Sequence, residues 1–481
     1  MKFVIQGNIN HNDVQTMSQT FFHHMRFDVA DILPSEGLCL MVQNAGVNIV
    51  AQLHENGMII QFAEVPITEN GIKGIRRATK LALYNIFVAQ TGYKPPWGLL
   101  TGIRPAKVAA EFLDQDSAPD DIRQALITQY FIDPSRATLC TDVAIAQRRI
   151  VAQNPQNAVS IYISVPFCPT ICHYCSFSAY PTDRYGKYMD AYVVALTKEV
   201  EYLSEISRGK RVENIYIGGG TPTALDDGNF ERLLATIVDN FDIRSVIEYT
   251  VEAGRPDTIT EGKLSLMKQY GVSRISINPQ TLNDPTLERI GRKHTASQFF
   301  QAYEAAQMAG FDNINIDLIL GLPDESINDV RRTLEGVANL RPNSCTIHTL
   351  AVKRASKLHE YPEMHSPAEI SLMEQMLTVS ADYMKSIGLN PYYMYRQKNS
   401  AGNFENVGYA AQSFEGRYNI HMMEEVQSIY AAGAGAVTKL VDAVQSRIER
   451  VFNLRSPVDY IEKIDEMIAR KEGLIKEIEG F

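Results

Sequence analysis

Short apolar runs alternate with longer amphipathic segments along the chain from residue 160 onward. The apolar runs have the length of buried strands and lie at Ile161–Val165, Asn214–Gly218, Ile247–Glu252, Arg274–Asn278, Asn313–Leu320 and Ser344–Leu350. The segments between them with helical periodicity include Tyr188–Ser204, Asn229–Phe241 and Ser297–Ala309. Strand followed by helix, repeated about six times, is typical of a parallel sheet with crossover helices. The pattern predicts an α/β fold, a partial (β/α)6 TIM-like barrel, with ligands at the carboxyl ends of its strands.

The first part of the chain has a different pattern. Three strand-like runs precede two helical patterns, at Cys39–Gln43, Val47–Leu53, Met58–Val65, Arg76–Thr91 and Pro105–Leu113. This order predicts an N-terminal α+β domain. A polar stretch with a proline at 148–157 marks a boundary near residue 158.

The chain is longer than one hydrophobic core supports, so several domains are expected. We expect residues 1–158 to form the N-terminal domain, 159–385 the barrel, and 386–481 a C-terminal region that is helical and lies on the substrate side. A C-terminal helix is predicted to open at Ser456 and Pro457, with an apolar face made of Val458, Ile461, Ile464 and Ile468.

Charge and composition exclude some classes of protein. A net charge of −10 argues against nonspecific binding of nucleic acid, which requires clustered Lys and Arg. No apolar run approaches the length of a membrane span. The apolar start of the chain ends after four residues, too soon for a signal peptide. We therefore expect a cytoplasmic protein in a reducing compartment.

Three of the six cysteines are closely spaced, and this spacing is the strongest chemical signal in the sequence. Cys168, Cys172 and Cys175 form a C-x3-C-x2-C pattern. A disulfide would need an oxidising compartment. A structural zinc site would need a fourth ligand, for which His173 is the nearby alternative. Three thiolates favour an iron–sulfur cluster with one iron left open. The remaining cysteines, Cys39, Cys140 and Cys345, lie apart and are expected to be buried apolar residues.

Polar residues stand at the ends of several predicted strands. The second strand runs into Gly218–Thr223, GGGTPT, where consecutive glycines let backbone approach a ligand. The others are Glu252, Gln280, Arg292 and Asp317. Asp317 lies within an apolar run, where a carboxylate needs a partner or a ligand. Together these side chains would suit ribose hydroxyls and an amino-acid head group. A structural salt bridge or strand cap is the alternative for each.

These motifs resemble the radical S-adenosylmethionine superfamily and, within it, the oxygen-independent coproporphyrinogen III oxidase (coproporphyrinogen dehydrogenase) family. The matching motifs are YISVPFC at 162–168, the cysteine trio, GGGTPT at 218–223 and NIDLILGLP at 315–323. The resemblance is firm over residues 160–355. An N-terminal WGLLTGIRP at 97–105 resembles the HemZ-type branch of this family.

The resemblance implies a radical S-adenosylmethionine enzyme of haem biosynthesis. Cys168, Cys172 and Cys175 would hold a 4Fe–4S cluster, whose electron would cleave S-adenosylmethionine to a 5′-deoxyadenosyl radical. Hydrogen abstraction would then lead to oxidative decarboxylation of propionates to vinyls. The partners implied are a tetrapyrrole substrate and a low-potential electron donor. The positions implied to contact S-adenosylmethionine are Tyr162, Tyr174, Gly219, Gly220, Thr221, Glu252, Gln280, Arg292, Asp317 and Ala351.

The sequence also departs from the family pattern. Oxidases carry a fourth cysteine two residues beyond the third, and Phe177 occupies that position here. Two alternatives therefore stay open: a haem-binding chaperone of the same family, or another radical tetrapyrrole enzyme that methylates and opens haem. The chaperones carry an HNxxYW signature, which this chain lacks because its only tryptophan is Trp97. The positive charge that would bind the carboxylates of a tetrapyrrole substrate could come from Lys353, Arg354, Arg396 and Lys398.

Overall fold

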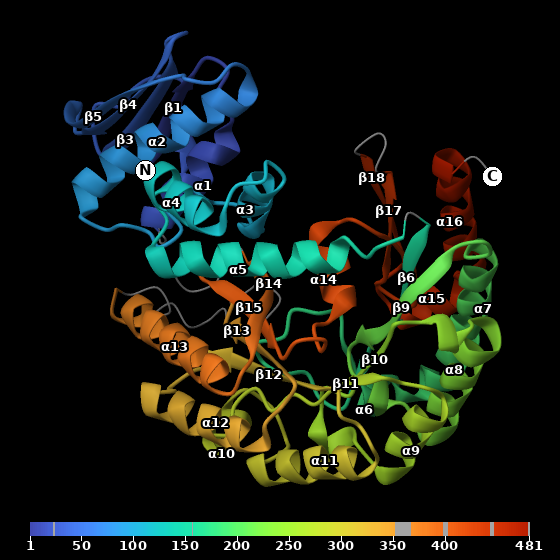
Figure 1. The fold of residues 1–481 in the computed structure, drawn as a ribbon. Coiled ribbons are helices and arrows are strands. Elements are labelled where there is room, and N and C mark those ends of the chain that lie inside the picture. Colours follow the sequence, from blue (N-terminus) through green and yellow to red (C-terminus); the bar gives the residue numbers. More distant parts are fainter. Residues whose placement is uncertain (23–24, 156, 352–366, 398–402, 443–446, 480–481) are drawn as a thin grey trace. The chain divides into compact units, whose positions relative to one another are not determined.

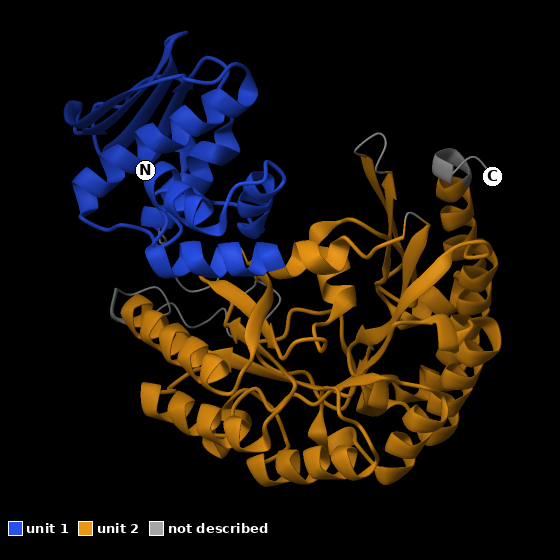
Figure 2. Ribbon diagram, viewed as in Figure 1, with its two compact units in different colours: residues 1–145 blue, residues 146–481 orange. Residues whose placement is uncertain are grey.

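The computed structural model describes residues 1–22, 25–155, 157–351, 367–397, 403–442 and 447–479. The chain forms two compact units, Met1–Ile145 and Ala146–Phe481 (Figure 2). The division falls inside the long helix α5, Pro134–Val151, and therefore earlier than the boundary expected near residue 158. The assignment of separate roles to 1–158, 159–385 and 386–481 stays a prediction.

The first unit is an α+β fold built on a five-stranded sheet of order β2-β1-β3-β4-β5. Strands β3, β4 and β5 form an antiparallel meander, and β1 pairs in parallel with β2 and β3. The strands are β1 Lys2–Gln6, β2 Asp28–Val29, β3 Leu38–Asn44, β4 Asn48–Glu55 and β5 Met58–Pro66. The helices are α1 His11–Phe21, α2 Ile72–Thr91, α3 Ala106–Leu113, α4 Pro119–Tyr130 and α5.

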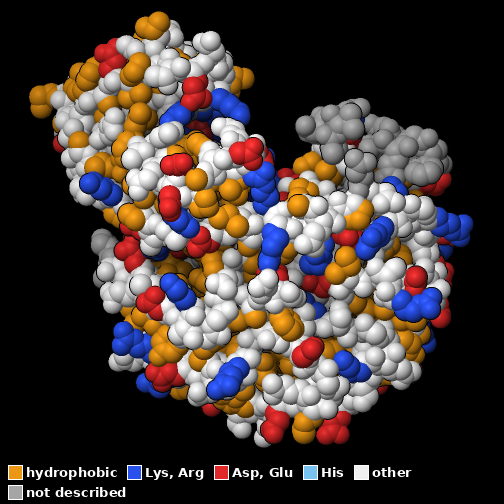
Figure 3. Space-filling view, viewed as in Figure 1, with side chains coloured by type: hydrophobic (Ala, Val, Ile, Leu, Met, Phe, Trp, Pro, Cys, Tyr) orange, Lys and Arg blue, Asp and Glu red, His pale blue; other side chains and the backbone are white. Residues whose placement is uncertain are grey.

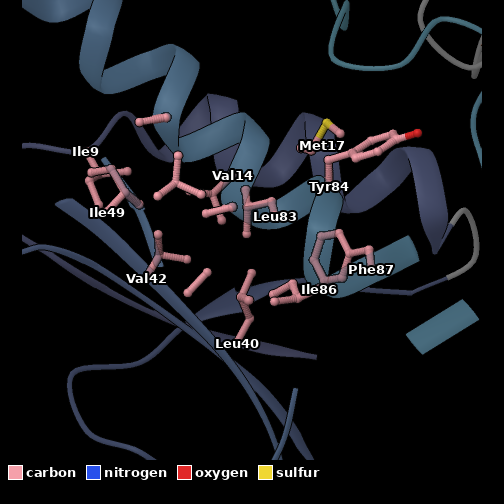
Figure 4. Close-up of a cluster of buried hydrophobic side chains, with 14 of the residues drawn as sticks. Ile9, Val14, Met17, Leu40, Val42, Ile49, Leu83, Tyr84, Ile86 and Phe87 are labelled. Carbon is pink, nitrogen blue, oxygen red and sulfur yellow. The ribbon is translucent and has the colours of Figure 1, made fainter. Parts of the chain in front are cut away.

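The core of this unit lies between the sheet and helices α1 and α2 (Figure 4). Alternate residues of the strands, such as Leu40, Val42 and Ile49, are fully buried there. They pack against Leu83 and Phe87 of α2. Because side chains alternate between the two faces of a strand, one face of the sheet supplies this core.

The second unit contains a curved sheet of eleven strands with helices along its outer side (Figure 1). Six parallel strands form its centre: β6 Ala158–Val165, β9 Arg211–Gly219, β10 Glu248–Glu252, β11 Arg274–Ser276, β12 Ile314–Leu320 and β13 Ser344–Thr349. Each overlaps one of the predicted strands. The crossover helices are α7 Met189–Ile206, α8 Asp227–Asn240, α9 Glu261–Gln269, α10 Asp284–Arg289, α11 Ala296–Met308 and α12 Ile327–Leu340. The predicted partial barrel is confirmed.

Short elements lie in the connections of the barrel. They are β7 Phe167–Cys168, β8 Tyr180–Pro181, α6 Thr182–Tyr185, and the 3-10 helices η1 Gly186–Tyr188, η2 Pro222–Ala224, η3 Ile243–Ser245 and η4 Pro256–Thr258. Most of them follow the carboxyl end of a parallel strand. They therefore belong to the loops in which a barrel places its ligands.

The C-terminal region adds five strands as well as helices. Strand β15 pairs antiparallel with β13 at one end of the parallel series, and β16 pairs in parallel with β6 at the other. The elements are α13 Pro367–Ser386, β14 Asn390–Arg396, β15 Glu405–Ala410, α14 Arg417–Glu424, β16 Ser428–Ala432, β17 Val437–Asp442, β18 Arg447–Phe452, α15 Pro457–Glu462 and α16 Ile464–Glu479. The sequence analysis expected the helices and missed these strands, which complete the wall of the barrel.

The prediction of a single last helix is wrong in one respect. The structure has two helices there, α15 and α16, which are separated at Lys463. Tyr460, Met467 and Lys471 are buried, whereas the predicted face of Val458, Ile461, Ile464 and Ile468 is only half-buried.

A buried ion pair attaches α16 to the barrel. Glu199 of α7 and Lys471 of α16 contact each other with both side chains fully buried. Glu199 also accepts hydrogen bonds from the Tyr460 hydroxyl at 2.5 Å and from the Gly433 N–H at 2.7 Å. Burial lowers the pKa of Lys471, although the Glu199 carboxylate opposes this. The network connects two C-terminal helices with the turn between β16 and β17.

On the face of the molecule drawn in Figure 3, Lys and Arg side chains are interspersed with Asp and Glu. Among the helices of the described residues, none is long and apolar enough to cross a membrane.

Candidate cofactor site

The cysteine loop begins at the carboxyl end of β6, the first strand of the barrel. Strand β7 contains Cys168 and pairs with β8, so the loop between them returns to its starting point. The Tyr180 N–H donates to the Pro166 carbonyl at 2.8 Å and closes the loop. Within it, the Cys175 N–H donates to the Cys172 carbonyl at 3.0 Å. This backbone geometry brings the three cysteines around one side of the barrel mouth.

His173 is held away from the thiols. Its N–H donates to the Ile290 carbonyl at 2.9 Å, and its ring Nδ1 contacts the Arg289 carbonyl at 2.9 Å. A Cβ atom on Gly291 would lie 2.9 Å from its Nε2, so the ring packs against that glycine. These contacts disfavour the zinc alternative, in which His173 would be the fourth ligand.

The three cysteines are not in disulfide bonds, and polar side chains contact the sulfurs of Cys168 and Cys172. Thr221 Oγ1 lies 3.4 Å from Cys168 Sγ, and Arg255 Nη1 donates to Cys172 Sγ at 3.9 Å. Among the described residues, no three His, Cys, Asp or Glu side chains converge on a single metal ion. A cubane cluster takes one thiolate on each of three irons, so its ligands are spread around the cluster. The donor set fits such a cluster.

The glycines after β9 make room for a ligand beside the cysteine loop. Gly219 has a φ of +107°, which side chains rarely allow. A Cβ atom on Gly220 would lie 2.6 Å from the Phe167 carbonyl oxygen, and one on Gly218 would lie 2.8 Å from Glu252 Oε2. Any side chain at these positions would push the strand end away from the loop.

One cavity of about 230 Å³, here called the cofactor pocket, collects the predicted residues at the carboxyl ends of the strands. Its lining includes Cys168, Cys172, Cys175, Tyr174, Gly219, Gly220, Thr221, Glu252, Gln280, Arg292, Asp317 and Ala351. Tyr162 is the exception. It lies in the middle of β6, below the strand end, and lines a neighbouring cavity instead.

Two carboxylates of the cofactor pocket have opposite pKa shifts. Burial raises the pKa of Glu252 to about 7, although the Tyr216 hydroxyl donates a hydrogen bond to it. Burial also acts on Asp317, but its contacts with His348 and Asn315 outweigh that effect and lower its pKa. Asn315 Nδ2 donates to Asp317 Oδ1 at 2.7 Å, and His348 Nε2 lies 3.8 Å from Oδ2. Asp317 is therefore the more persistent anion.

Gln280 has a strained backbone and an unsatisfied side chain. Its φ is +70°, in the left-handed region that non-glycine residues seldom adopt. The residue is buried, and its Oε1 has no hydrogen-bond partner among the described residues. Since a buried polar atom without a partner is costly, this oxygen fits a ligand that donates a hydrogen bond.

Arg292 is fixed by the strand ends around it. Its Nη1 donates to the Asn278 carbonyl at 2.5 Å and to the Gly254 carbonyl at 3.3 Å, and its Nε donates to the Tyr174 hydroxyl at 3.2 Å. It connects two barrel strands to the cysteine loop and orients Tyr174.

Sequence reasoning missed several residues of this pocket: Arg255, Asn278, His348, Tyr395 and Gln397. Arg255 could have been found, since it follows Glu252 by three residues in the same strand-end loop. Its guanidinium is paired with Asp257 and also donates to Thr170 Oγ1 at 3.1 Å. Tyr395 and Gln397 come from β14 and the loop after it, which the sequence analysis did not place in the barrel.

Replacing Glu252 by Gln is expected to change the pH dependence of stability. The raised pKa means that the folded protein favours protonated Glu252. The stability that protonated Glu252 contributes is fully present below pH 4.5, the pKa of this carboxyl in the unfolded chain. It is lost as pH rises through about 7, its pKa in the folded protein. The free energy of unfolding of the cofactor-free wild type should therefore fall, relative to E252Q, by about 1–3 kcal/mol between pH 4.5 and 8. Urea denaturation at both pH values tests this, and parallel pH profiles would contradict it.

A parallel partial barrel with three thiols in the loop after its first strand defines a protein of the radical S-adenosylmethionine class. A family model described as "Radical SAM superfamily" matches residues 162–337. The chain is 34% identical to the oxygen-independent coproporphyrinogen-III oxidase-like protein HemZ of Bacillus subtilis (strain 168), over 97% of this chain and 96% of that protein. The chain therefore belongs to the HemZ and HemN family of radical S-adenosylmethionine proteins.

Two further relatives bear on the fold and the function. The heme chaperone HemW of Lactococcus lactis subsp. lactis (strain IL1403) is 29% identical over 67% of this chain and 80% of its own length. The structure of coproporphyrinogen III oxidase (HemN) from Escherichia coli superimposes with a TM-score of 0.51 at 22% identity, covering 68% of this chain and 73% of that one. The last likeness shows the fold. The cofactors of the family are a 4Fe–4S cluster and S-adenosylmethionine.

Proposed function

We propose that this protein is an oxygen-independent coproporphyrinogen III oxidase-like enzyme that converts propionate side chains of a tetrapyrrole to vinyl groups with loss of carbon dioxide. Cys168, Cys172 and Cys175 hold the cluster in this proposal. The cluster and S-adenosylmethionine together supply a 5′-deoxyadenosyl radical when bound.

The other residues of the cofactor pocket have binding and positioning roles in this proposal. Thr221 and Arg255 contact the sulfurs and hold two cysteines in place. Gly219 and Gly220 leave backbone groups open to the methionine part of S-adenosylmethionine. Glu252, Gln280 and Asp317 offer oxygen acceptors to its hydroxyl and amino groups. The positions Tyr174, Arg292 and Ala351 complete the wall.

The observation that carries the proposal is a second, larger cavity next to the cofactor pocket. This barrel chamber has a volume of about 800 Å³. Phe177, Glu252, Asp317, His348, Tyr395 and Gln397 line both cavities. A large substrate in the chamber would therefore meet the cofactor pocket directly. Because β14, α14, β17 and β18 supply much of the lining, we also propose 386–481 as the substrate-side region.

The position of Phe177 favours a contact of its side chain with the substrate rather than with the cluster. It stands where oxidases have a fourth cysteine, and its side chain is 74% exposed at the boundary of the two cavities. An exposed phenylalanine offers an apolar face to a flat ring. The cluster needs only the three cysteines before it, so the replacement leaves the radical chemistry possible.

The oxidase, the haem chaperone and the haem-opening radical enzyme differ in their products, and one experiment separates these three functions. Anaerobically reconstituted, reduced protein is incubated with S-adenosylmethionine and coproporphyrinogen III, or with haem, and the products are analysed by mass spectrometry. We expect coproporphyrinogen III to lose two carbon dioxide molecules and four hydrogens. Each propionate that becomes a vinyl group gives up carbon dioxide, one hydrogen atom to the 5′-deoxyadenosyl radical, one proton, and one electron to an acceptor. A methylated linear product from haem would support the other radical enzyme. Haem bound without conversion, and no decarboxylation, would support a chaperone like HemW.

Replacing Asp317 by Asn is expected to weaken S-adenosylmethionine binding by about tenfold, because a charge-assisted hydrogen bond is worth about 1.5–3 kcal/mol. The cluster should be retained, since no hydrogen bond among the described residues joins Asp317 to a cysteine of the C-x3-C-x2-C loop. Equilibrium binding measures the first effect and the iron–sulfur absorption the second. Unchanged affinity would make Asp317 a structural partner of His348.

A further inference from the structure

The barrel chamber is bounded by tyrosines from several elements. Tyr162 of β6, Tyr216 of β9 and Tyr418 of α14 form a cluster of three mutually stacked rings, with centroid distances of 6.2, 6.1 and 4.5 Å. Tyr393 and Tyr395 of β14 form another stacked pair at 6.3 Å. All five line the chamber. Strands β6 and β9 lie far from β14 in the order of the sheet, so the rings belong to different walls of the barrel. Such walls suit a large, flat ligand.

The charged groups of the chamber are unevenly distributed. Glu252 and Asp317 lie at the end shared with the cofactor pocket. Lys439 of β17 pairs with Ile429, which in turn pairs with Ser160 near the start of β6. Ser160 precedes the end of β6 at Val165 by five residues, or about 17 Å of strand. Lys439 therefore marks the end of the chamber that is remote from the cysteine loop.

Two cations face each other across the strands at this remote end. Lys439 and Arg450 are directly opposite in the register of β17 and β18, and both line the chamber. Like charges in this position destabilise a sheet. Lys439 Nζ donates to the Met422 carbonyl at 3.0 Å, and Arg450 is paired with Glu425 at 2.8 Å. A guanidinium has five N–H donors, so Arg450 can hold a second anion beside the Glu425 carboxylate.

Arg274 is the third cation of the chamber lining, and its guanidinium is hydrogen-bonded to neighbouring strands and loops of the barrel. Arg274 donates to Ser344 Oγ at 2.9 Å, to the Phe414 carbonyl at 2.8 Å and to Asn313 Oδ1 at 2.9 Å. Lys439 is buried as well, so the difference is the number of polar partners that already use the Arg274 guanidinium. Its contacts hold the base of the barrel together. Lys439 and Arg450 are therefore the better candidates for contact with a ligand.

We propose that Lys439 and Arg450 form a carboxylate-binding site at the remote end of the barrel chamber, which anchors the acidic side arms of a flat, polycarboxylate macrocycle. The ring would lie between the tyrosine walls, with another side arm directed to the cofactor pocket. This inference rests on the proposed function for its substrate class and adds the residues that select it. The sequence analysis named Lys353, Arg354 and Lys398 for this role; they lie outside the described residues, and that part of the prediction stays a prediction. The Arg396 guanidinium is buried and donates to the Asn403 carbonyl at 2.8 Å.

Binding of coproporphyrin III, a stable tetracarboxylate, and of its tetramethyl ester tests the site in the full-length protein by fluorescence titration. Wild type should bind the tetra-acid at least about tenfold more tightly than the ester. K439M and R450Q should each weaken binding of the acid by about tenfold or more, as expected for a lost charge-assisted hydrogen bond, and leave ester binding unchanged. R450K should recover part of the affinity.

R447Q is the matched control, because Arg447 lies on the same strand, three residues from Arg450 and therefore on its opposite face. It should bind the acid as wild type does. Binding of the acid by K439M and R450Q with wild-type affinity would overturn the inference. Equal affinity of the wild type for acid and ester would overturn it too, and this second measurement does not depend on the folding of any variant. Loss of binding in the variants without decarboxylation by wild type would instead refute the proposed function alone.

Discussion

Replacing Cys172 by Ala is expected to abolish the brown iron–sulfur absorption of anaerobically reconstituted protein and, with it, cleavage of S-adenosylmethionine. The cluster has only three protein ligands in the proposed arrangement, so the loss of one leaves two thiolates for four irons. Cys172 is also the most buried of the three, and Arg255 contacts its sulfur. Iron and sulfide analysis together with the absorption spectrum measures the effect.

Cys345 provides the matched control for this experiment. It is fully buried in β13 of the same barrel, as predicted, and it is absent from the cofactor pocket. C345A should keep the cluster and lose only the stability that removal of a small buried group costs. A C172A protein with the same iron content and spectrum as C345A would rule out the assignment of the ligands.

Replacing Lys471 by Met is expected to destabilise the second unit by about 3–5 kcal/mol, because it leaves the Glu199 carboxylate buried without its cation. Both side chains have an exposed fraction of zero, so water cannot replace the lost partner. Urea denaturation should show the transition of this unit at a clearly lower midpoint.

Two further variants separate the cost of an unpaired charge from a general loss of packing. The double variant E199Q/K471M removes both charges and should recover much of the lost free energy. K198Q breaks an exposed pair between Lys198 and Asp465 and should change stability by less than about 1 kcal/mol. If K471M were no less stable than K198Q, the buried pair would contribute nothing.

The parallel strands were predictable because buried strands in a barrel are short, apolar and separated by helical segments. The predicted run at Asn214–Gly218 lies within β9, and Ser344–Leu350 coincides with β13 apart from its last residue. The later strands β14 to β18 were not predictable in this way. Strand β18, for instance, reads RIERVF, which combines three charged and three apolar residues without strict alternation on a half-exposed hairpin. Its place in the sheet depends on pairing with β17, which no local pattern reveals.

The residues of the candidate site also fall into two groups, those that the sequence predicted and those that it did not. Residues at or shortly after the end of a parallel strand, such as Glu252 and Gln280, could be placed together, because the carboxyl ends of such strands meet at one edge of the sheet. Tyr162 and Tyr174 were grouped by motif alone. The structure separates them, since Tyr162 lies within the strand and Tyr174 in the loop beyond it. His348 escaped notice because its contact with Asp317 crosses from β13 to β12.

By itself the sequence determined the class of fold, the three thiols in one loop and most of the cofactor pocket, because those features are set by local spacing and by the periodicity of strands and helices. Tertiary structure alone decided the size of the barrel chamber, the tyrosines on its walls and the pairing of Lys439 with Arg450. The chamber and its walls depend on contacts between residues far apart in the chain, as does the pair of Glu199 with Lys471, whereas the placement of Lys439 opposite Arg450 depends on the register of β17 and β18. Such contacts arise when the hydrophobic surfaces of the elements are buried against each other, and that packing leaves no periodic signal along the chain.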